Sequence, residues 1–270
     1  MIDISKEKLM SALFYDIDGT IISDITKKIP ESAIEALKRA KENGHQIFVN
    51  TGRTICSVPP MIKKIEFDGF LCGCGTYILY EGQVLMAHNI PKERGYTYVD
   101  AMEQCNLDGL LEGTEDIYFS KNNYRIQEME NARRYMKSLG LGMKTFMENK
   151  NYQYDKLLIR ADEKSDKERF FSAIQEDLIP IDRLNGVYEC IQKDYSKATA
   201  IEYMRKHLGL EKGQIYVFGD SSNDLAMFEY ADHAIAMGTY DPVLEPYTEH
   251  VTDTVENDGI YKAMYHYGFI

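Results

Sequence analysis

One stretch near the N-terminus, residues 13–21, places two carboxylates at the end of an apolar run. Leu13-Phe14-Tyr15 is followed directly by Asp16-Ile17-Asp18-Gly19-Thr20. This pattern is typical of a buried strand in an α/β sheet that carries its polar residues at the carboxyl end. Two carboxylates one residue apart repel each other, and a bound cation is the common compensation. The alternative interpretation is a strand followed by an ordinary Asp-Gly turn.

Three later segments carry side chains of the kinds that bind phosphate and metal ions. They are Thr51-Gly52-Arg53, Lys197, and Gly219-Asp220-Ser221-Ser222-Asn223-Asp224. Two of them end predicted strands, and the lysine begins a predicted helix. Because the carboxyl ends of strands in an open α/β sheet face one crevice, we expect these groups to converge with Asp16 and Asp18. Clustered carboxylates suit Mg²⁺, whereas a hydroxyl, a backbone N–H and an ammonium suit phosphate oxygens. The pattern therefore predicts phosphoryl transfer.

The order of predicted elements indicates a sheet domain interrupted by a second domain. Strands and helices alternate in the opening third and again from residue 196 onward, which favours a parallel sheet with helices on both faces. The intervening strands look antiparallel, and Asn185-Gly186 predicts a tight hairpin turn. We therefore expect an α/β core from residues 1–82 and 188–270, with an inserted α+β domain over residues 83–187.

Two predicted helices concern positions that matter below. The first should run from about Ser57 through Ile65, since Pro59-Pro60 lies near its start. The second should span residues 165–177, with Ser165 as its cap.

Charge and hydropathy exclude several classes of function. The 270 residues carry a net charge of −12 at pH 7, which argues against nucleic acid or an anionic membrane as the main partner. An anionic substrate would need a metal ion or a basic pocket to offset this charge. No stretch approaches the about 18 uninterrupted apolar residues of a membrane span, and the first ten residues lack the apolar core of a signal peptide.

The cysteines indicate a reducing, cytoplasmic setting. The chain has five of them, an odd and scattered set. Only Cys72 and Cys74 lie close together, and their spacing is too short for the two-residue zinc knuckle. We expect buried structural thiols rather than metal ligands.

With the four motifs in this order and a large insertion between the second and third, the sequence resembles the haloacid dehalogenase-like hydrolase superfamily of aspartate-based phosphatases. It is most similar to the branch typified by Cof-type sugar-phosphate phosphatases, which carry a large α+β cap. The resemblance covers the whole length, and the first and fourth motifs are its most specific part. It implies a Rossmann-like core and a Mg²⁺-dependent phosphatase acting on a small phosphorylated metabolite, with a sugar phosphate as the expected class.

The resemblance also implies roles for single residues. Asp16 would attack phosphorus and become an aspartyl-phosphate, and Asp18 would protonate the leaving alcohol and then activate water. The groups expected to hold the phosphoryl oxygens are Thr51, Gly52, Lys197 and Asn223. The Mg²⁺ ligands are expected to be Asp16, the main-chain carbonyl of Asp18, and Asp220, with Asp224 supporting the metal's waters and Lys197.

Several alternatives stay open on the sequence. Asp220 has a second interpretation as a helix N-cap. Arg53 could contact substrate, or pair with a carboxylate and brace its loop. Relatives often carry Asn-Gly where this chain has Cys72-Gly73-Cys74-Gly75, so substrate contacts or redox sensitivity could differ there. Ala198 follows Lys197 where glycine is frequent.

Three other functions compete with the phosphatase hypothesis. A phosphomutase or another phosphotransferase would pass the phosphoryl group to a sugar instead of water. A metabolite-binding protein would keep the fold without the chemistry, but the intact Asp16, Asp18, Lys197 and Asp220 argue against it. A dehalogenase is disfavoured because the Mg²⁺ carboxylates are present. The sequence carries no signal for an oligomeric state.

Overall fold

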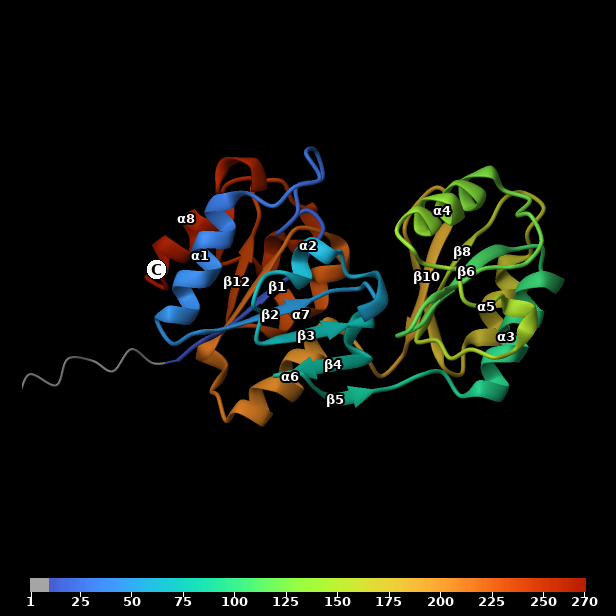
Figure 1. Ribbon diagram of the computed structural model, residues 1–270, viewed down its shortest axis with the longest axis horizontal. Coiled ribbons are helices and arrows are strands. Elements are labelled where there is room, and N and C mark those ends of the chain that lie inside the picture. The colour runs from blue at the N-terminus through green and yellow to red at the C-terminus, as the bar shows by residue number, and fades with distance from the viewer. Residues whose placement is uncertain (1–9) are drawn as a thin grey trace, which may run out of the picture. The chain divides into compact units, whose positions relative to one another are not determined.

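The computed structural model describes residues 10–270, which fall into two compact units (Figure 1). The first unit comprises the described chain up to Gly52, Pro60–Leu85 and Ser196–Ile270. The second comprises Arg53–Pro59 and Met86–Tyr195. Each unit has its own sheet, as expected for a core domain interrupted by an insertion.

The first unit is built on an eight-stranded sheet in the order β13-β12-β11-β1-β2-β3-β4-β5. The neighbours from β13 to β3 are parallel, and β4 returns antiparallel to β3. The strands are β1 (Ala12–Tyr15), β2 (Gln46–Asn50), β3 (Gly69–Cys72), β4 (Tyr77–Tyr80), β5 (Gln83–Ala87), β11 (Ile215–Gly219), β12 (His233–Ala236) and β13 (His250–Val251).

Helices cover both faces of this sheet. From β1 the chain crosses to β2 on one side, whereas from β11 it crosses to β12 on the other. Since such crossovers are right-handed, they place α1 and α7 on opposite faces. In agreement, α1 packs against α8 and α6 packs against α7. The helices are α1 (Glu31–Glu42), α2 (Pro60–Lys63), α6 (Lys197–Leu208), α7 (Leu225–Tyr230) and α8 (Gly259–His266).

The central strand β1 explains why the opening stretch is apolar. All four of its residues are buried, because β11 and β2 flank it and helices cover both faces. Phe14 pairs with Val217 on one side and with Phe48 on the other, and the Phe14 and Phe48 rings stack at 4.8 Å. The expectation of a Rossmann-like parallel core is therefore confirmed.

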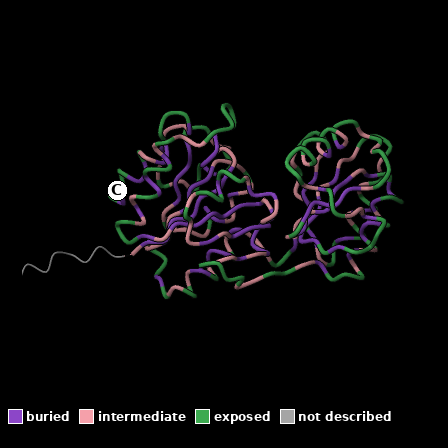
Figure 2. The backbone as a smooth tube through the Cα atoms, in the orientation of Figure 1, coloured by how far each residue is buried: buried purple, intermediate pink, exposed green. Residues whose placement is uncertain are grey.

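The second unit is a five-stranded antiparallel sheet in the order β7-β6-β8-β10-β9. Figure 2 shows its strands as mostly buried. One apolar cluster joins the sheet to helices α3 and α5, including Met102, Leu157, Phe170 and Cys190. The elements are α3 (Lys92–Gln104), β6 (Asp108–Glu112), β7 (Ile117–Tyr118), α4 (Gln127–Ser138), β8 (Lys156–Arg160), α5 (Lys167–Ile174), β9 (Leu178–Asp182) and β10 (Val187–Gln192).

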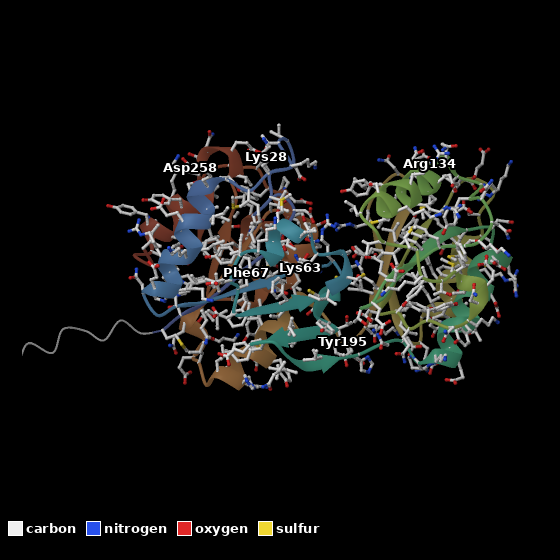
Figure 3. All side chains as sticks on the ribbon, viewed as in Figure 1. Lys28, Lys63, Phe67, Arg134, Tyr195 and Asp258 are labelled. Atoms are coloured by element: carbon white, nitrogen blue, oxygen red, sulfur yellow. The ribbon has the colours of Figure 1, made fainter. Side chains whose placement is uncertain are left out.

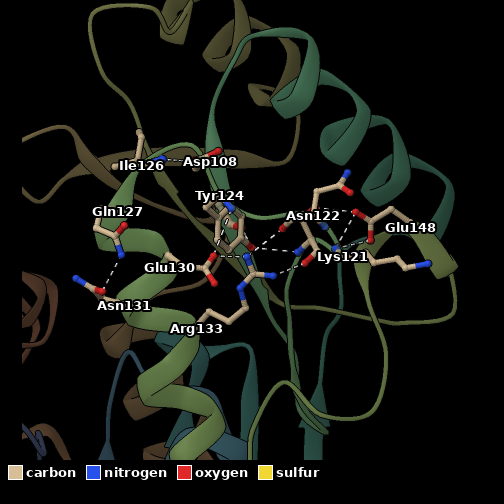
Figure 4. Close-up of polar contacts among 12 residues, drawn as sticks. Asp108, Lys121, Asn122, Tyr124, Ile126, Gln127, Glu130, Asn131, Arg133 and Glu148 are labelled. Carbon is tan, nitrogen blue, oxygen red and sulfur yellow. Dashed lines mark hydrogen bonds and ion pairs between the residues drawn. The ribbon is translucent and has the colours of Figure 1, made fainter.

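A buried arginine fastens α4 to the loop that follows β7 (Figure 4). The guanidinium of Arg133 donates to the carbonyls of Ser120 at 2.8 Å and Asn122 at 2.9 Å, and it pairs with Glu130. It also lies 4.5 Å from the centre of the Tyr124 ring, a cation–π contact. These contacts offset the cost of burying its charge.

Replacing this arginine is expected to destabilise the second unit. Arg133→Met keeps the apolar stem but removes the charged hydrogen bonds, which should cost about 2 kcal/mol. The neighbouring Arg134 is exposed, so Arg134→Met should change stability by less than about 0.5 kcal/mol. Urea unfolding of the two variants measures the difference, and equal midpoints would show that the Arg133 network adds nothing.

The expected domain boundary at residues 187/188 differs from the division in the structure. It falls at the start of β10, which pairs with β8 through Cys190↔Leu157 and with β9 through Cys190↔Pro180. The strand therefore belongs to the second sheet, and the chain returns to the first unit at Ser196. Arg53–Pro59 also groups with the second unit, which the sequence did not indicate.

Three local predictions need correction. The helix expected over residues 57–65 is only the four residues of α2, preceded by a 3₁₀ turn at Ile55–Ser57. Asp166, not Ser165, caps α5 by accepting from the Arg169 N–H at 3.2 Å. The β9–β10 turn has three residues with positive φ, since Leu184 joins Asn185 and Gly186.

The cysteine and membrane predictions can be compared directly with the described chain. All five cysteines are free thiols, of which Cys56 is partly exposed and the other four are buried. Within residues 10–270, no helix has the length and apolarity needed to cross a bilayer. The cytoplasmic location remains a prediction.

Candidate active site

Three adjacent parallel strands bring the predicted polar residues to one edge of the sheet. Asp16 follows β1, and its N–H still donates to the Phe218 carbonyl of β11 at 3.0 Å. Asp220 follows β11, and Thr51 follows β2. Because β11, β1 and β2 are neighbours, their carboxyl ends deliver these residues side by side. The predicted convergence of the motifs is present in the structure.

Lys197 lies between two of the aspartates. Its ammonium is 2.6 Å from Asp16 Oδ1 and 2.6 Å from Asp224 Oδ1, and its side chain is only 1% exposed. Burial alone would lower the pKa of Lys197, but the two carboxylates outweigh it and raise the pKa well above its ordinary value. The lysine is therefore a fixed positive charge at the centre of the site.

The start of α6 is fixed in a way that aims Lys197 at the aspartates. Ser196 caps the helix by accepting from the Thr199 N–H at 3.2 Å, and Thr199 Oγ1 accepts from the Ser196 N–H in return. Asn50 Nδ2 donates to the Lys197 carbonyl at 3.2 Å. A Cβ on Gly75, where φ is +96°, would lie 2.3 Å from the Ser196 carbonyl. The unusual Cys-Gly-Cys-Gly loop thus packs closely against this helix start.

A group of three carboxylates surrounds a position suited to a cation. One oxygen each from Asp16, Asp220 and Asp224 lies within 4.8 Å of the others. Burial, partly offset by Lys197 and reinforced by Asp224, raises the pKa of Asp16 to about 6. Burial together with Asp16 and Asp224 raises the pKa of Asp220 to about 8. One lysine does not balance this cluster, and oxygen ligands of this kind favour Mg²⁺.

Asp224 is held by the protein on both of its oxygens. Its Oδ1 accepts from Lys197, and its Oδ2 accepts from the backbone N–H groups of Asp220 at 2.9 Å and Ser221 at 3.1 Å. A Cβ on Gly219 would lie 2.6 Å from this carboxylate, so glycine makes the approach possible. These contacts suit the supporting position expected for Asp224 better than direct coordination.

The remaining predicted residues lie around this cluster in different environments. Asp18 is partly exposed, and its carboxylate is not in the described group of three. Thr51 and Gly52 are buried where β2 ends. Asn223 is partly exposed, and its Oδ1 accepts from Ser221 Oγ at 2.8 Å. The expected contact of Asp18 with a metal concerned its main-chain carbonyl, and it stays a prediction.

Arg53 braces its own loop. Its guanidinium donates to the Ser57 carbonyl at 3.2 Å, and it lies near enough to Glu112 to lower the pKa of that carboxyl. Burial is the larger influence there, and the net effect is a raised pKa for Glu112. The geometry favours the bracing role of the two roles considered for Arg53.

Sequence reasoning missed two residues of the site. Thr20 Oγ1 donates to Asp220 Oδ1 at 2.9 Å, which links the first motif to the fourth. Gly19 has φ of +79°, and a Cβ there would lie 2.3 Å from Asp220 Oδ2. Both stand inside the Asp16–Thr20 motif, so the signal was their direct succession to Asp18.

Magnesium is expected to stabilise the protein, and more at pH 8 than at pH 6. The folded-state pKa values of Asp16 (about 6) and Asp220 (about 8) exceed the ordinary 3.8, so without metal the folded state takes up protons and loses stability as pH rises. A cation relieves this repulsion but competes with protons at lower pH. At 100 times its Kd, Mg²⁺ should add about 2.7 kcal/mol and raise Tm by about 5–10 °C.

Thermal unfolding with and without Mg²⁺ at both pH values tests this expectation. Asp220→Asn is the matched control, because it removes one cluster charge while keeping the size of the side chain. It should show a much smaller rise. An equal rise in Asp220→Asn, or no rise in the wild type, would contradict a metal site at these carboxylates.

Comparison with known proteins assigns the family. Residues 13–264 match the family described as haloacid dehalogenase-like hydrolase. YkrA of Bacillus subtilis (strain 168) is 28% identical over 267 residues, covering 96% of this chain and 98% of YkrA. The 5-amino-6-(5-phospho-D-ribitylamino)uracil phosphatase YitU of the same strain is 24% identical over 262 residues, covering 93% of this chain and 95% of YitU.

Solved structures share the whole architecture. The subclass IIB sugar phosphatase BT4131 superimposes with a TM-score of 0.79 at 26% identity, covering 97% of this chain and 100% of BT4131. A protein from Geobacillus kaustophilus HTA426 gives a TM-score of 0.84 at 23% identity, covering 97% of this chain and 100% of its own. This chain therefore belongs to the haloacid dehalogenase-like hydrolase family, as a phosphatase of its Cof-type, subclass IIB branch with a cap domain.

Proposed function

We propose that this protein is a Mg²⁺-dependent phosphatase that hydrolyses a small sugar phosphate through an aspartyl-phosphate on Asp16. The observation that carries the proposal is the buried Lys197 ammonium held 2.6 Å from both Asp16 and Asp224, beside the Asp220 carboxylate. A nucleophile, a fixed cation and a cluster of metal-binding oxygens are the components that phosphoryl transfer needs.

Asp16 is the nucleophile in this proposal. Lys197 hydrogen-bonds its Oδ1 only, at 2.6 Å, and opposes the rise in pKa that burial causes. A carboxylate oxygen of Asp16 attacks phosphorus, and the bond from phosphorus to the leaving alkoxide oxygen breaks. Because burial also restrains the side chain, little reorganisation is needed at the moment of attack.

Asp18 handles the proton in both halves of the reaction. It first donates a proton to the leaving oxygen, which departs as an alcohol. Its carboxylate then accepts a proton from water, whose oxygen attacks phosphorus and displaces Asp16 as a free carboxylate. The partial exposure of Asp18, two residues beyond the buried Asp16, suits a group that must meet both an alcohol and water.

The remaining groups would hold the phosphoryl oxygens and the cation. Thr51, the Gly52 N–H, Lys197 and Asn223 are the proposed phosphate ligands. Asp16, the Asp18 carbonyl and Asp220 would hold Mg²⁺, with Asp224 behind them. When bound, the ion supplies positive charge against the charge that gathers on the phosphoryl oxygens.

The expected substrate class rests on two supports. The protein carries a net charge of −12, so a phosphorylated substrate gains affinity only where Lys197 and a metal supply local positive charge. BT4131, a relative of known structure, is a sugar phosphatase. A small polar phosphomonoester fits both observations.

Phosphate release from a panel of sugar phosphates, nucleotides and pyridoxal phosphate, with and without Mg²⁺, tests the proposal. Release that needs Mg²⁺ and is fastest with a sugar phosphate is the expected result. Fast release only from nucleotides would refute the substrate class. Release that appears only when a sugar acceptor is added, with phosphate moved to that acceptor, would assign a phosphotransferase instead.

A further inference from the structure

A second cavity lies in the first unit, between α1 and α2 and above the start of β2. Its volume is about 660 Å³, within the range of small-molecule sites. The apolar wall consists of Ile29, Ile34, Ile47, Met61 and Ile65. Figure 3 labels Lys28, which precedes α1, and Lys63, which ends α2, on the two sides of this region.

The short second crossover explains why this cavity is open. α1 has 12 residues, whereas α2 has only four and covers much less of the sheet. Ile34 and Met61 are consequently each 42% exposed, although both belong to an apolar wall. Soluble proteins seldom leave a concave apolar surface of this kind without a function.

The rim of the cavity is basic in a strongly acidic protein. Lys28, Lys38, Lys41 and Lys64 line it, against only two glutamates. Lys38 and Lys41 follow Ile34 at intervals of four and three residues, so all three share one stripe of α1. A net positive rim above an apolar wall is complementary to an amphiphilic anion.

Two of the four lysines are available for such an anion. Lys41 is engaged, at 3.0 Å from Asp68, and Lys38 lies 3.7 Å from Glu42. Within residues 10–270, the ammonium groups of Lys28 and Lys64 have neither a hydrogen-bond partner nor an ion-pair partner. They can therefore bind an added anionic group without breaking an existing pair.

We propose that this cavity binds a small amphiphilic anion, with an apolar body against the isoleucines and an acidic head group between Lys28 and Lys64. The cavity is separate from the catalytic carboxylates in the fold. Its floor residue Ile47 lies near the amino end of β2, whereas Thr51 of the phosphate motif follows the carboxyl end. The proposal does not depend on the phosphatase mechanism.

Binding of anilinonaphthalene sulfonate, an apolar aromatic body with one sulfonate, tests the proposal by fluorescence titration of the folded protein. The wild type should bind one equivalent saturably. The double variant Lys28→Glu, Lys64→Glu should raise Kd by at least about tenfold, because it places negative charge beside the sulfonate. Lys63→Glu makes the same charge change one residue away, outside the cavity lining, and should shift Kd by less than about twofold.

A steric variant and a competitor locate the bound probe. Ile34→Trp should fill the cavity and abolish binding, and it should fold normally because Ile34 is 42% exposed. Inorganic phosphate, which would occupy the catalytic site, should leave the probe bound. Absence of saturable binding in the wild type, displacement of the probe by phosphate, or equal weakening in Lys63→Glu would each overturn the proposal.

Discussion

Replacing Asp16 by asparagine is expected to lower phosphate release by about 10⁴-fold or more, the size of loss seen when a covalent nucleophile is removed. The amide has nearly the same shape as the carboxylate but is not nucleophilic. Initial rates with the best substrate of the panel, at saturating Mg²⁺, measure the effect.

The fold should survive this substitution. Asp16 is 3% exposed and crowded by other carboxylates, which is why its pKa is raised to about 6. Removing its charge should leave the unfolding temperature without metal unchanged or slightly higher. Asp16→Ala guards against slow deamidation of the asparagine back to aspartate. Phosphate release by both variants within about tenfold of the wild type would refute the nucleophile assignment.

Replacing Lys197 by methionine is expected to give the largest loss of stability in the molecule, about 3–5 kcal/mol. The ammonium is the shared partner of Asp16 and Asp224, and all three side chains are at most 5% exposed. Without it, buried carboxylates face one another with no positive charge between them. Turnover should fall by at least about 10²-fold, since the same ammonium would stabilise charge on the phosphoryl group.

Two further variants separate charge from packing in this result. Lys206, on the same helix, is 68% exposed, so Lys206→Met should cost less than about 1 kcal/mol. Adding Asp224→Asn to Lys197→Met should restore part of the stability, because it removes one of the unpaired charges. Urea unfolding at pH 8 without metal shows the effect most clearly. Equal stability of Lys197→Met and Lys206→Met would contradict the proposed balance of charge.

The sequence predicted the site well because its residues follow strand ends. A parallel strand that ends in polar residues has only one edge at which to deliver them, so Asp16, Thr51 and Asp220 could be placed together without coordinates. The position of Lys197 depended on a helix start that Ser196 and Thr199 mark in the sequence. Burial of four of the five cysteines followed from their apolar neighbours in the same way.

Contacts between distant segments could not be predicted in this way. That Thr20 donates to Asp220, or that Gly75 must lack a side chain beside Ser196, depends on how loops meet across the sheet edge. Helix length was equally hard to judge. The stretch over residues 57–65 has helical composition, but regular α-helix forms only over Pro60–Lys63.

The boundary of the inserted domain was placed too early for a related reason. The strand Val187–Gln192 is apolar enough for either sheet, so its pattern does not reveal its partners. Its pairing with β8 and β9 decides the matter. The cavity between α1 and α2 was missed as well, because a cavity is the absence of side chains and leaves no local pattern.

The most direct test of the proposed mechanism is rapid acid quench of the enzyme during turnover, followed by mass measurement of the intact protein and of its peptides. The mechanism predicts a fraction of enzyme heavier by one phosphoryl group, located on the peptide that contains Asp16, released by hydroxylamine, and missing in Asp16→Asn. A phosphoryl group that resists hydroxylamine, or one located on another residue, would contradict an aspartyl-phosphate on Asp16.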